Sequence, residues 1–348
     1  MREVVFTLVS NTNGCVLFAN VLLRDFVQGV CVELLPVQEF GAHSACVTCV
    51  EFSPVDSRVF ATSSRDGSVR LWSLSKDGKT TSPLHTLPRG HTDVVSSLAW
   101  LPDGSSLVSA SWDRTIRKWD GHTGQCVFAS EAVHSDWVYA VACAPNGRHV
   151  VTGGVDCCLY VWNTSSGGVV MGPLTGHTSA VMAVTYSPHG RHFLSGSEDG
   201  SILVWDSNSG MQLFGPLTAH SNWIRSISYH PSGETFVTCS FDKTIRIWNA
   251  KTFTTVHVVC RAHDDWTRSV QCSVDGRFVL SASEDGTLKV WDVIRGECVN
   301  DAAEHGTSVS WAVFSPDVRR VVSGGAYGSV RVWEVKVIGN FTCECSLE

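Results

Sequence analysis

The sequence predicts an all-β protein in which one small sheet unit is repeated seven times. Three observations support this prediction: four residue types recur in register, short strand-like runs lie between them, and no segment shows a long helical period. Self-similarity at a fixed period of about 20 to 50 residues identifies a repeat architecture and takes priority over local assignments. The repeat therefore determines the fold class.

A histidine opens each repeat, and an aspartate follows it at a fixed distance. Successive histidines are 43 residues apart from His91 to His263, whereas the first interval is 48 because one loop is longer. The seven histidines are His43, His91, His134, His177, His220, His263 and His305. The aspartate lies 22 residues later, or 23 in the first repeat, and the seventh repeat has Tyr327 in its place. The six aspartates are Asp66, Asp113, Asp156, Asp199, Asp242 and Asp285.

A hydroxyl residue and a tryptophan complete the recurring set. The hydroxyl residue lies four residues before the aspartate position, and the tryptophan lies six residues after it. The hydroxyl residues are Thr62, Ser109, Thr152, Ser195, Thr238, Ser281 and Ser323. The tryptophans are Trp72, Trp119, Trp162, Trp205, Trp248, Trp291 and Trp333. Because four positions recur in register in all seven repeats, chance does not explain them.

The repeat at residues 176–206 shows the composition of a small sheet. Its runs at 180–186, 191–195 and 201–205 are short and rich in β-branched and aromatic residues, and turn-forming residues separate them. One such unit has too little face to bury a core alone. We therefore expect neighbouring units to pack face to face.

These motifs resemble the WD40 repeat family, whose units end in Trp-Asp or a variant. The residues after the seven tryptophans are Ser73, Asp120, Asn163, Asp206, Asn249, Asp292 and Glu334. The resemblance covers residues 41–334 and implies a seven-bladed β-propeller with four antiparallel strands in each blade around a central channel. Within the family, the runs MGPLTGH at 171–177 and SPHGRHFLSGSEDG at 187–200 are similar to fungal WD-repeat proteins, including the repeat arrays of NACHT-type signalling proteins.

The resemblance also implies a structural role for the recurring residues, which would link the strands of a blade through buried hydrogen bonds. The structural residues that we assign in this way in repeats two and four are His91, Ser109, Asp113, Trp119, His177, Ser195, Asp199 and Trp205. Since Tyr327 replaces the aspartate in the seventh repeat, that repeat is expected to lack the carboxylate.

Two segments at the ends of the chain compete to close the ring. We expect residues 1–28 to form an N-terminal extension that could carry extra strands, and residues 29–348 to form the propeller. The stretch 29–37 is similar to the outer-strand runs that precede later histidines, and in this family such a strand commonly completes the last blade. Residues 341–345 are also strand-like, so the C-terminal closure stays open, although we favour the N-terminal one.

Composition narrows the range of partners and compartments. The net charge is −7 and the chain has no basic run, which argues against nucleic-acid binding. The apolar run at residues 4–10 is too short to span a membrane. Many of the 14 cysteines lie in strand-like runs, and Cys46 and Cys49 form a CxxC motif without a second ligand pair. We therefore expect structural thiols, no metal site, and an intracellular location in the cytoplasm or nucleus.

The recurring residues include the ingredients of an acyl-transfer triad, but their repetition favours a structural role. Six repeats contain a histidine, a hydroxyl residue and an aspartate. A nucleophile needs one activated and accessible site, not copies around a ring. The sequence also has neither a phosphate-binding Walker loop nor an HExxH motif. We therefore expect a protein that is not an enzyme and that binds no cofactor.

The variable positions beside the recurring residues suggest a binding surface. In the family, the positions three and five residues after the histidine, and the one before the aspartate, look out from the top face and the channel mouth. Here they carry an aromatic and arginine-rich set: Trp112, Trp137, Tyr139, Trp223, Arg225, Phe241, Trp266 and Arg268. Such residues are enriched at binding hot spots, and the arginines favour an acidic or phosphorylated peptide. The alternative is that the tryptophans pack between blades.

These observations predict a non-catalytic scaffold that docks partner proteins or peptides on the top face of the propeller. Two alternatives remain: a substrate receptor of a ubiquitin ligase, or the recognition module of a longer signalling protein. The Trp-Asp-x-Arg box that is common in ligase receptors is missing after Trp119, Trp205 and Trp291, which disfavours the first alternative. An enzyme built on a propeller frame would require an active-site cluster that the sequence does not display.

Overall fold

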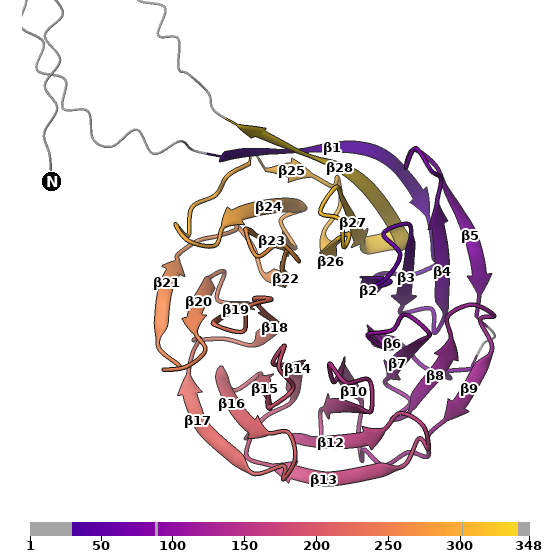
Figure 1. Cartoon of the computed structure of the whole chain (residues 1–348), viewed down its shortest axis with the longest axis vertical. Helices are drawn as coiled ribbons and strands as arrows, with labels where there is room; N and C mark the ends of the chain where they lie inside the picture. The colour runs from indigo at the N-terminus through magenta and orange to yellow at the C-terminus, as the bar shows by residue number, and fades with distance from the viewer. Residues whose placement is uncertain (1–29, 88–89, 301, 340–348) are drawn as a thin grey trace, which may run out of the picture.

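The computed structural model describes residues 30–87, 90–300 and 302–339. It contains seven four-stranded antiparallel sheets arranged as a ring (Figure 1), so the predicted all-β, seven-bladed propeller is confirmed. The proposed N-terminal extension at 1–28 and the competing C-terminal strand at 341–345 lie outside the described residues.

Each of the first six blades takes its four strands consecutively from the chain. Blade one contains β2 (Val47–Phe52), β3 (Val59–Ser64), β4 (Val69–Leu74) and β5 (Thr81–Thr86), and blade two contains β6 (Val95–Trp100), β7 (Ser106–Ser111), β8 (Ile116–Asp120) and β9 (Cys126–Ala129). Blade three contains β10 (Val138–Cys143), β11 (His149–Gly154), β12 (Cys158–Asn163) and β13 (Val169–Thr175), and blade four contains β14 (Val181–Tyr186), β15 (His192–Ser197), β16 (Ser201–Asp206) and β17 (Gln212–Thr218). Blade five contains β18 (Ile224–Tyr229), β19 (Thr235–Ser240), β20 (Ile245–Asn249) and β21 (Thr255–Val259), and blade six contains β22 (Thr267–Cys272), β23 (Phe278–Ser283), β24 (Thr287–Asp292) and β25 (Ala303–Glu304).

Blade seven combines strands from both ends of the described chain. It contains β26 (Val309–Phe314), β27 (Arg320–Gly325), β28 (Ser329–Gly339) and, as its outer strand, β1 (Val30–Gly41); the 3-10 turn η1 (Ala326–Gly328) joins β27 to β28. The β1–β28 pairing is antiparallel and runs from Val30 opposite Gly339 to Gly41 opposite Ser329. Strand β1 also reaches blade six, because the Val32 amide donates to the Val299 carbonyl at 2.7 Å. The N-terminal segment therefore supplies the fourth strand that completes the ring.

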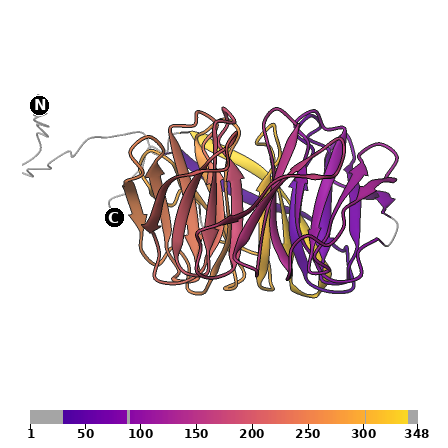
Figure 2. The same ribbon diagram turned by 90° about the horizontal axis from the view of Figure 1, so that it is seen from below.

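The strands of a blade differ in burial according to their distance from the ring's edge. The second strand is buried at every residue in β7 and β23, whereas the outer strand β17 is exposed at nearly every residue. The first strands surround the central channel, and the outer strands form the wall of the ring (Figures 1 and 2). We call the end of the channel that carries the histidine loops and the aspartate turns the top face, and the opposite end the bottom face.

The hydrophobic core lies between neighbouring blades. In one cluster, Phe236 and Trp248 of blade five pack against Leu194 and Ile202 of blade four. The Phe236 and Trp248 rings are stacked with centroids 5.8 Å apart. Burying a side chain of this size stabilises the fold by about 1.5 to 3 kcal/mol. Because each blade uses both faces in this way, a single repeat depends on its neighbours for stability.

Side chains also join the first strands of adjacent blades across the channel wall. The Ser96 hydroxyl of β6 donates to the Val138 carbonyl of β10 at 2.6 Å. Gln271 of β22 accepts a hydrogen bond from the Phe314 amide of β26 at 2.6 Å through its Oε1 atom. These strands belong to different sheets, so side chains satisfy backbone groups that no neighbouring strand pairs.

Candidate functional site: the top face of the propeller

The recurring residues form a hydrogen-bonded staple in each of the first six blades. In blade five, His220 Nδ1 lies 2.9 Å from Asp242 Oδ2 and His220 Nε2 lies 2.7 Å from Thr238 Oγ1. The Trp248 indole donates to the same hydroxyl oxygen at 2.9 Å. Since an ionised carboxylate can only accept, the neutral histidine carries its proton on Nδ1, and its Nε2 therefore accepts the hydroxyl proton.

The eight residues assigned a structural role in repeats two and four all take part in such staples. In blade two, His91 lies 2.8 Å from Asp113 and 2.7 Å from Ser109, to which Trp119 donates at 2.9 Å. In blade four, His177 Nε2 lies 2.7 Å from Ser195 Oγ and Trp205 donates to Ser195 at 2.8 Å. The His177 to Asp199 contact is longer, at 3.4 Å.

Blade seven keeps only part of the staple. Trp333 still donates to Ser323 at 2.8 Å, but the side chain at the aspartate position, Tyr327, is 86% exposed. His305 Nε2 is buried without a hydrogen-bond partner among the described residues, and His305 Nδ1 lies 3.3 Å from the Thr307 hydroxyl. Blade seven thus lacks both histidine contacts of the other staples: the carboxylate at Nδ1 is replaced by a hydroxyl, and Nε2 makes no hydrogen bond to Ser323.

The staple explains how the ionisable groups titrate. Burial lowers the pKa of His43 to about 4, even though the adjacent Asp66 acts to raise it. For Asp199, burial alone would raise the pKa, but hydrogen bonds from Ser201 and from the Thr178 amide outweigh it and lower the pKa to about 2. The folded state therefore favours neutral histidine and ionised aspartate at neutral pH.

We expect acid to destabilise the propeller in two stages. A histidine with a lowered folded pKa, such as His43, contributes stability above its unfolded value near 6.5, and this stability is lost as the pH falls toward about 4. The aspartates contribute stability above their unfolded pKa and lose it at lower pH.

Glu51 has the opposite effect on the pH dependence of stability. Burial raises its pKa to about 8, so protonation of Glu51 stabilises the folded state as the pH falls. Thermal melts between pH 7 and pH 3.5 should show a falling melting temperature, with a steeper fall in a Glu51→Gln variant; a flat profile in that variant would contradict the assignment.

The staple hydroxyls are not accessible as nucleophiles. Ser109, Ser195 and Thr238 are each 0% exposed, and each accepts a hydrogen bond from a buried tryptophan. A substrate could not approach these oxygens without opening the blade. Their geometry supports a structural role.

The first aromatic cluster of the top face joins blades two and three. The rings of Trp112 and Trp137 are parallel within 4° and their centroids are 4.1 Å apart. Tyr139 meets Trp112 edge-on at 5.9 Å. Trp137 is 39% exposed, so it stacks on a neighbouring blade and also presents ring surface to solvent. We call these three residues the blade 2/3 cluster.

The second aromatic cluster joins blades five and six. Phe241 is buried between Trp223 and Trp266, at centroid distances of 5.4 and 4.5 Å, and both tryptophans are about two-fifths exposed. The Arg268 guanidinium lies over the Phe241 ring at 5.2 Å. It also forms an ion pair with Glu284, with Nε 2.6 Å from the carboxylate oxygen. We call Trp223, Phe241, Trp266 and Arg268 the blade 5/6 cluster.

The structure places seven of the eight predicted top-face residues in two separate clusters on opposite sides of blade four. Blade four lies between the clusters and contributes the buried small and flexible side chains Ala180 and Met182 at the corresponding positions. Arg225 belongs to neither cluster, because it points toward the channel, with its guanidinium 5.7 Å from the Trp311 ring. Trp137, Trp223 and Trp266 stack on aromatic rings and also expose part of their own surface to solvent. Packing and surface exposure are therefore combined in the same indole side chains.

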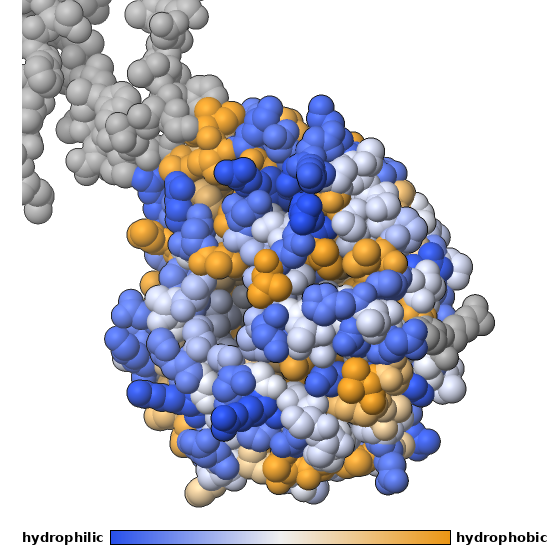
Figure 3. All heavy atoms as spheres, turned by 45° about the vertical axis from the view of Figure 1, so that its right-hand side comes forward, coloured by the Kyte–Doolittle hydropathy of each residue, from blue (hydrophilic) through white to orange (hydrophobic). Residues whose placement is uncertain are grey.

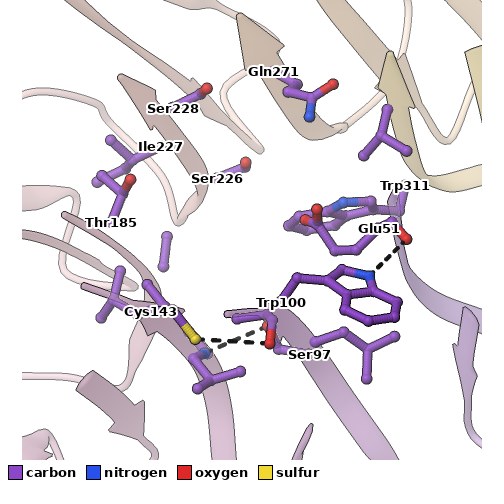
Figure 4. Close-up of a pocket in the computed structure, with 18 of the residues that line it drawn as sticks. Glu51, Ser97, Trp100, Cys143, Thr185, Ser226, Ile227, Ser228, Gln271 and Trp311 are labelled. Atoms are coloured by element: carbon purple, nitrogen blue, oxygen red, sulfur yellow. Dashed lines mark hydrogen bonds between the residues drawn. The ribbon is translucent and has the colours of Figure 1, made fainter. Parts of the chain in front are cut away.

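The sequence led us to expect a central channel but not the residues that line it. A cavity of about 320 Å³ runs along it, and its lining includes Glu51, Trp100 and Trp311 (Figure 4). A signal was present in the repeat, since Glu51 lies eight residues after its histidine, where the other repeats carry uncharged residues. Those residues are Ala99, Ala142, Thr185, Ser228, Gln271 and Val313.

Comparison with known proteins supports the repeat assignment. The model of the WD40 family, described as "WD domain, G-beta repeat", matches residues 34–73, 81–120, 124–163, 168–206, 211–249, 253–292 and 296–334. In the described part of the chain, no helix is long and apolar enough to cross a membrane.

Curated relatives match about a quarter of the chain. Mitochondrial division protein 1 of Candida glabrata is 37% identical over 91 residues, which are 24% of this chain and 12% of that protein. Polyadenylation factor subunit 2 of Kluyveromyces lactis is 40% identical over 70 residues, 20% of this chain and 16% of that protein. Small ribosomal subunit protein RACK1 of Schizosaccharomyces pombe is 37% identical over 84 residues, 24% of this chain and 27% of that protein. The match therefore spans well under two thirds of each relative.

Proposed function

The chain belongs to the WD40 repeat family, and from this premise we propose that it is a scaffold that docks partner proteins or peptides on the top face of its propeller. Proteins of this family are generally non-catalytic interaction modules. The observation that carries the proposal is the pair of aromatic clusters, in which Trp137, Trp223 and Trp266 are held by stacking and remain 39 to 43% exposed.

Stacking makes these rings suitable anchors for a partner. A ring held against its neighbour loses little conformational freedom on binding, and stacked aromatic pairs are worth about 0.5 to 1.5 kcal/mol beyond area burial. Tryptophan, tyrosine and arginine are the residue types most enriched at binding hot spots. On the part of the surface that Figure 3 shows, apolar residues lie in small groups separated by hydrophilic ones. These features favour the top face.

The channel mouth gives the proposed partner a chemical preference. We propose that an acidic or phosphorylated group is bound by Arg225 and Arg65, whose charges both act on the Tyr139 hydroxyl. Burial, followed by repulsion from Arg268, lowers the pKa of Arg225 to about 10, so it stays charged at neutral pH. Arg268 is less suited to this role because Glu284 already pairs with it.

We further propose an intracellular location for the scaffold. Its described cysteines are free thiols, and several are buried in strands, as in Cys49 and Cys239. Burial raises the pKa of both thiols, which keeps them protonated and unreactive. Free thiols of this kind are typical of a reducing compartment.

An affinity pulldown with matched variants tests the proposed function. Replacing Trp137, Trp223 and Trp266 by alanine should remove the wild-type partners, with captured amounts at least tenfold lower, because the anchors on both clusters are lost. A control triple variant, Val55→Ala, Val274→Ala and Ile294→Ala, truncates exposed apolar residues of bottom-face turns and should capture the same partners as the wild type.

Thermal melts of all three proteins accompany the pulldown. The aromatic variant should melt only a few degrees below the wild type, since each tryptophan is partly exposed. Partners retained by the aromatic variant would place the docking surface elsewhere. A collapsed melt would show that the tryptophans act mainly as core residues.

A further inference from the structure

The central channel holds a cavity that is large enough for a small ligand or a long side chain. Its volume is about 320 Å³, at the lower end of the range of about 300 to 1,000 Å³ typical of ligand pockets. The lining extends from Tyr139, Met182 and Arg225 at the top to Pro54 and Pro102 at the bottom. Both prolines lie in turns between the first and second strands of their blades, so the cavity reaches the bottom face.

Glu51 places a carboxyl group in the lower part of this cavity. Among the described residues that line the cavity, Glu51 is the one carboxylic acid and Arg225 the one strong base. Glu51 lies eight residues after the histidine of its repeat, and Arg225 lies five residues after the histidine of its own. This difference of three residues places the two side chains at levels of the channel that differ by roughly 10 Å, at about 3.3 Å per residue along a strand. The two groups form no ion pair, and no described lysine or arginine pairs with Glu51.

The surroundings of Glu51 leave its carboxyl group without a partner. Its carboxyl group has no hydrogen-bond donor among the described residues, although the Trp100 indole donates to its backbone carbonyl at 3.2 Å. Figure 4 shows the Glu51 side chain directed into the cavity, with Trp100 and Trp311 on the same wall. Burial alone raises the pKa of Glu51 to about 8. A lone carboxylate in such a site disfavours folding, so its presence is better explained by a cation that joins it.

The other lining groups indicate an organic cation and not a metal ion. Trp100 and Trp311 offer indole rings, which attract ammonium and guanidinium groups. Thr185, Ser228 and the Gln271 side chain supply polar atoms on the opposite side of the cavity. Calcium and magnesium require about six oxygen ligands, often several carboxylates, and no cluster of three acidic, cysteine or histidine residues exists in the described chain.

We propose that the channel binds an alkylammonium or alkylguanidinium group through the Glu51 carboxylate, and that this cation enters the channel from the bottom face. The alkyl part lies along the small and apolar lining residues, such as Ala99, Ala142 and Val313, and the positive end pairs with the carboxylate. The cation can be a free amine or a lysine or arginine side chain, since both present the same chemistry. This site lies toward the bottom end of the channel, whereas the proposed docking surface is at the top end, and the site does not depend on that surface.

Titration of the protein with model cations tests the site. The probes are n-butylammonium, n-butylguanidinium and the uncharged 1-butanol. Binding is followed by calorimetry and by the intrinsic fluorescence of the 13 tryptophans, of which Trp100 and Trp311 line the cavity. We expect saturable binding of at least one cation and none of butanol. Glu51→Gln should weaken binding at least tenfold, whereas Glu33→Gln, which removes an exposed acid of β1, should leave it unchanged. The peptide acetyl-Gly-Lys-Gly-amide shows whether the source is a protein side chain or a free amine, and binding of either supports the site.

Two further measurements keep the test decisive. Glu51→Asp retains the charge on a shorter side chain and should bind more tightly than Glu51→Gln, and thermal melts establish that both variants fold. Three results would overturn the proposal: no saturation by any cation or by the lysine peptide, equal binding by the wild type and Glu51→Gln, or displacement of the amine by an equimolar concentration of potassium chloride.

Discussion

Replacing Val32 by aspartate is expected to lower the free energy of unfolding by at least about 4 kcal/mol, which is a large part of the total stability of an ordinary domain. Val32 is 1% exposed and belongs to the core cluster that includes Phe278 and Leu280 of blade six and Phe314 of blade seven. An aspartate there would bury an unpaired carboxylate in apolar surroundings. It would also loosen β1, which is the strand that completes the ring.

The neighbouring Glu33 provides the control for this prediction. Glu33 lies on the same strand but is exposed, so Glu33→Ala should change the free energy of unfolding by less than about 0.5 kcal/mol. Urea unfolding of both variants at pH 7 measures the difference. If Val32→Asp unfolded at the same urea concentration as the wild type, this would contradict the inference that packing of β1 closes the ring.

Replacing Asp242 by alanine is expected to cost about 3 kcal/mol through loss of the blade-five staple. The carboxylate accepts hydrogen bonds from His220 Nδ1, the Ser221 amide and the Thr244 amide, at 2.9, 3.2 and 3.0 Å. Its side chain is only 7% exposed, so water cannot fully replace it. The alanine variant would leave several polar groups near the top face without partners.

Blade seven supplies a natural control for the staple. Tyr327 occupies the same repeat position but is 86% exposed, and the structure gives its side chain no hydrogen bond to His305. Tyr327→Ala should therefore change the stability by less than about 0.5 kcal/mol in the same urea measurement. Equal losses for Asp242→Ala and Tyr327→Ala would contradict the view that the carboxylate holds the staple together.

The repeat made the fold predictable because its signals are local. Each unit carries its histidine, hydroxyl, aspartate and tryptophan within about 30 residues, so the blade can be recognised without knowledge of distant contacts. The pairing of β1 with β28 joins segments about 300 residues apart, and sequence could only offer two candidate segments for it. The choice between them depends on packing against blades six and seven.

The top-face site was predictable in composition but not in arrangement. The repeat register identified Trp112 and Trp137 as variable positions, yet their stacking brings together residues of different blades. Likewise, Glu284 and Arg268 are 16 residues apart in the chain, and only the turn between β22 and β23 brings them into contact. Glu51 escaped notice because it faces the channel at a repeat position that the other six blades fill with uncharged residues.

Site-specific photo-crosslinking tests the docking surface most directly. A benzophenone amino acid would replace, one at a time, Trp137 and Trp266 on the top face and Val274 and Ile294 on the bottom face, all of which are exposed. Crosslinks to partner proteins should form from the two top-face positions and not from the two bottom-face ones. Crosslinks from Val274 or Ile294 alone would show that partners dock on the opposite face and would contradict the proposed function.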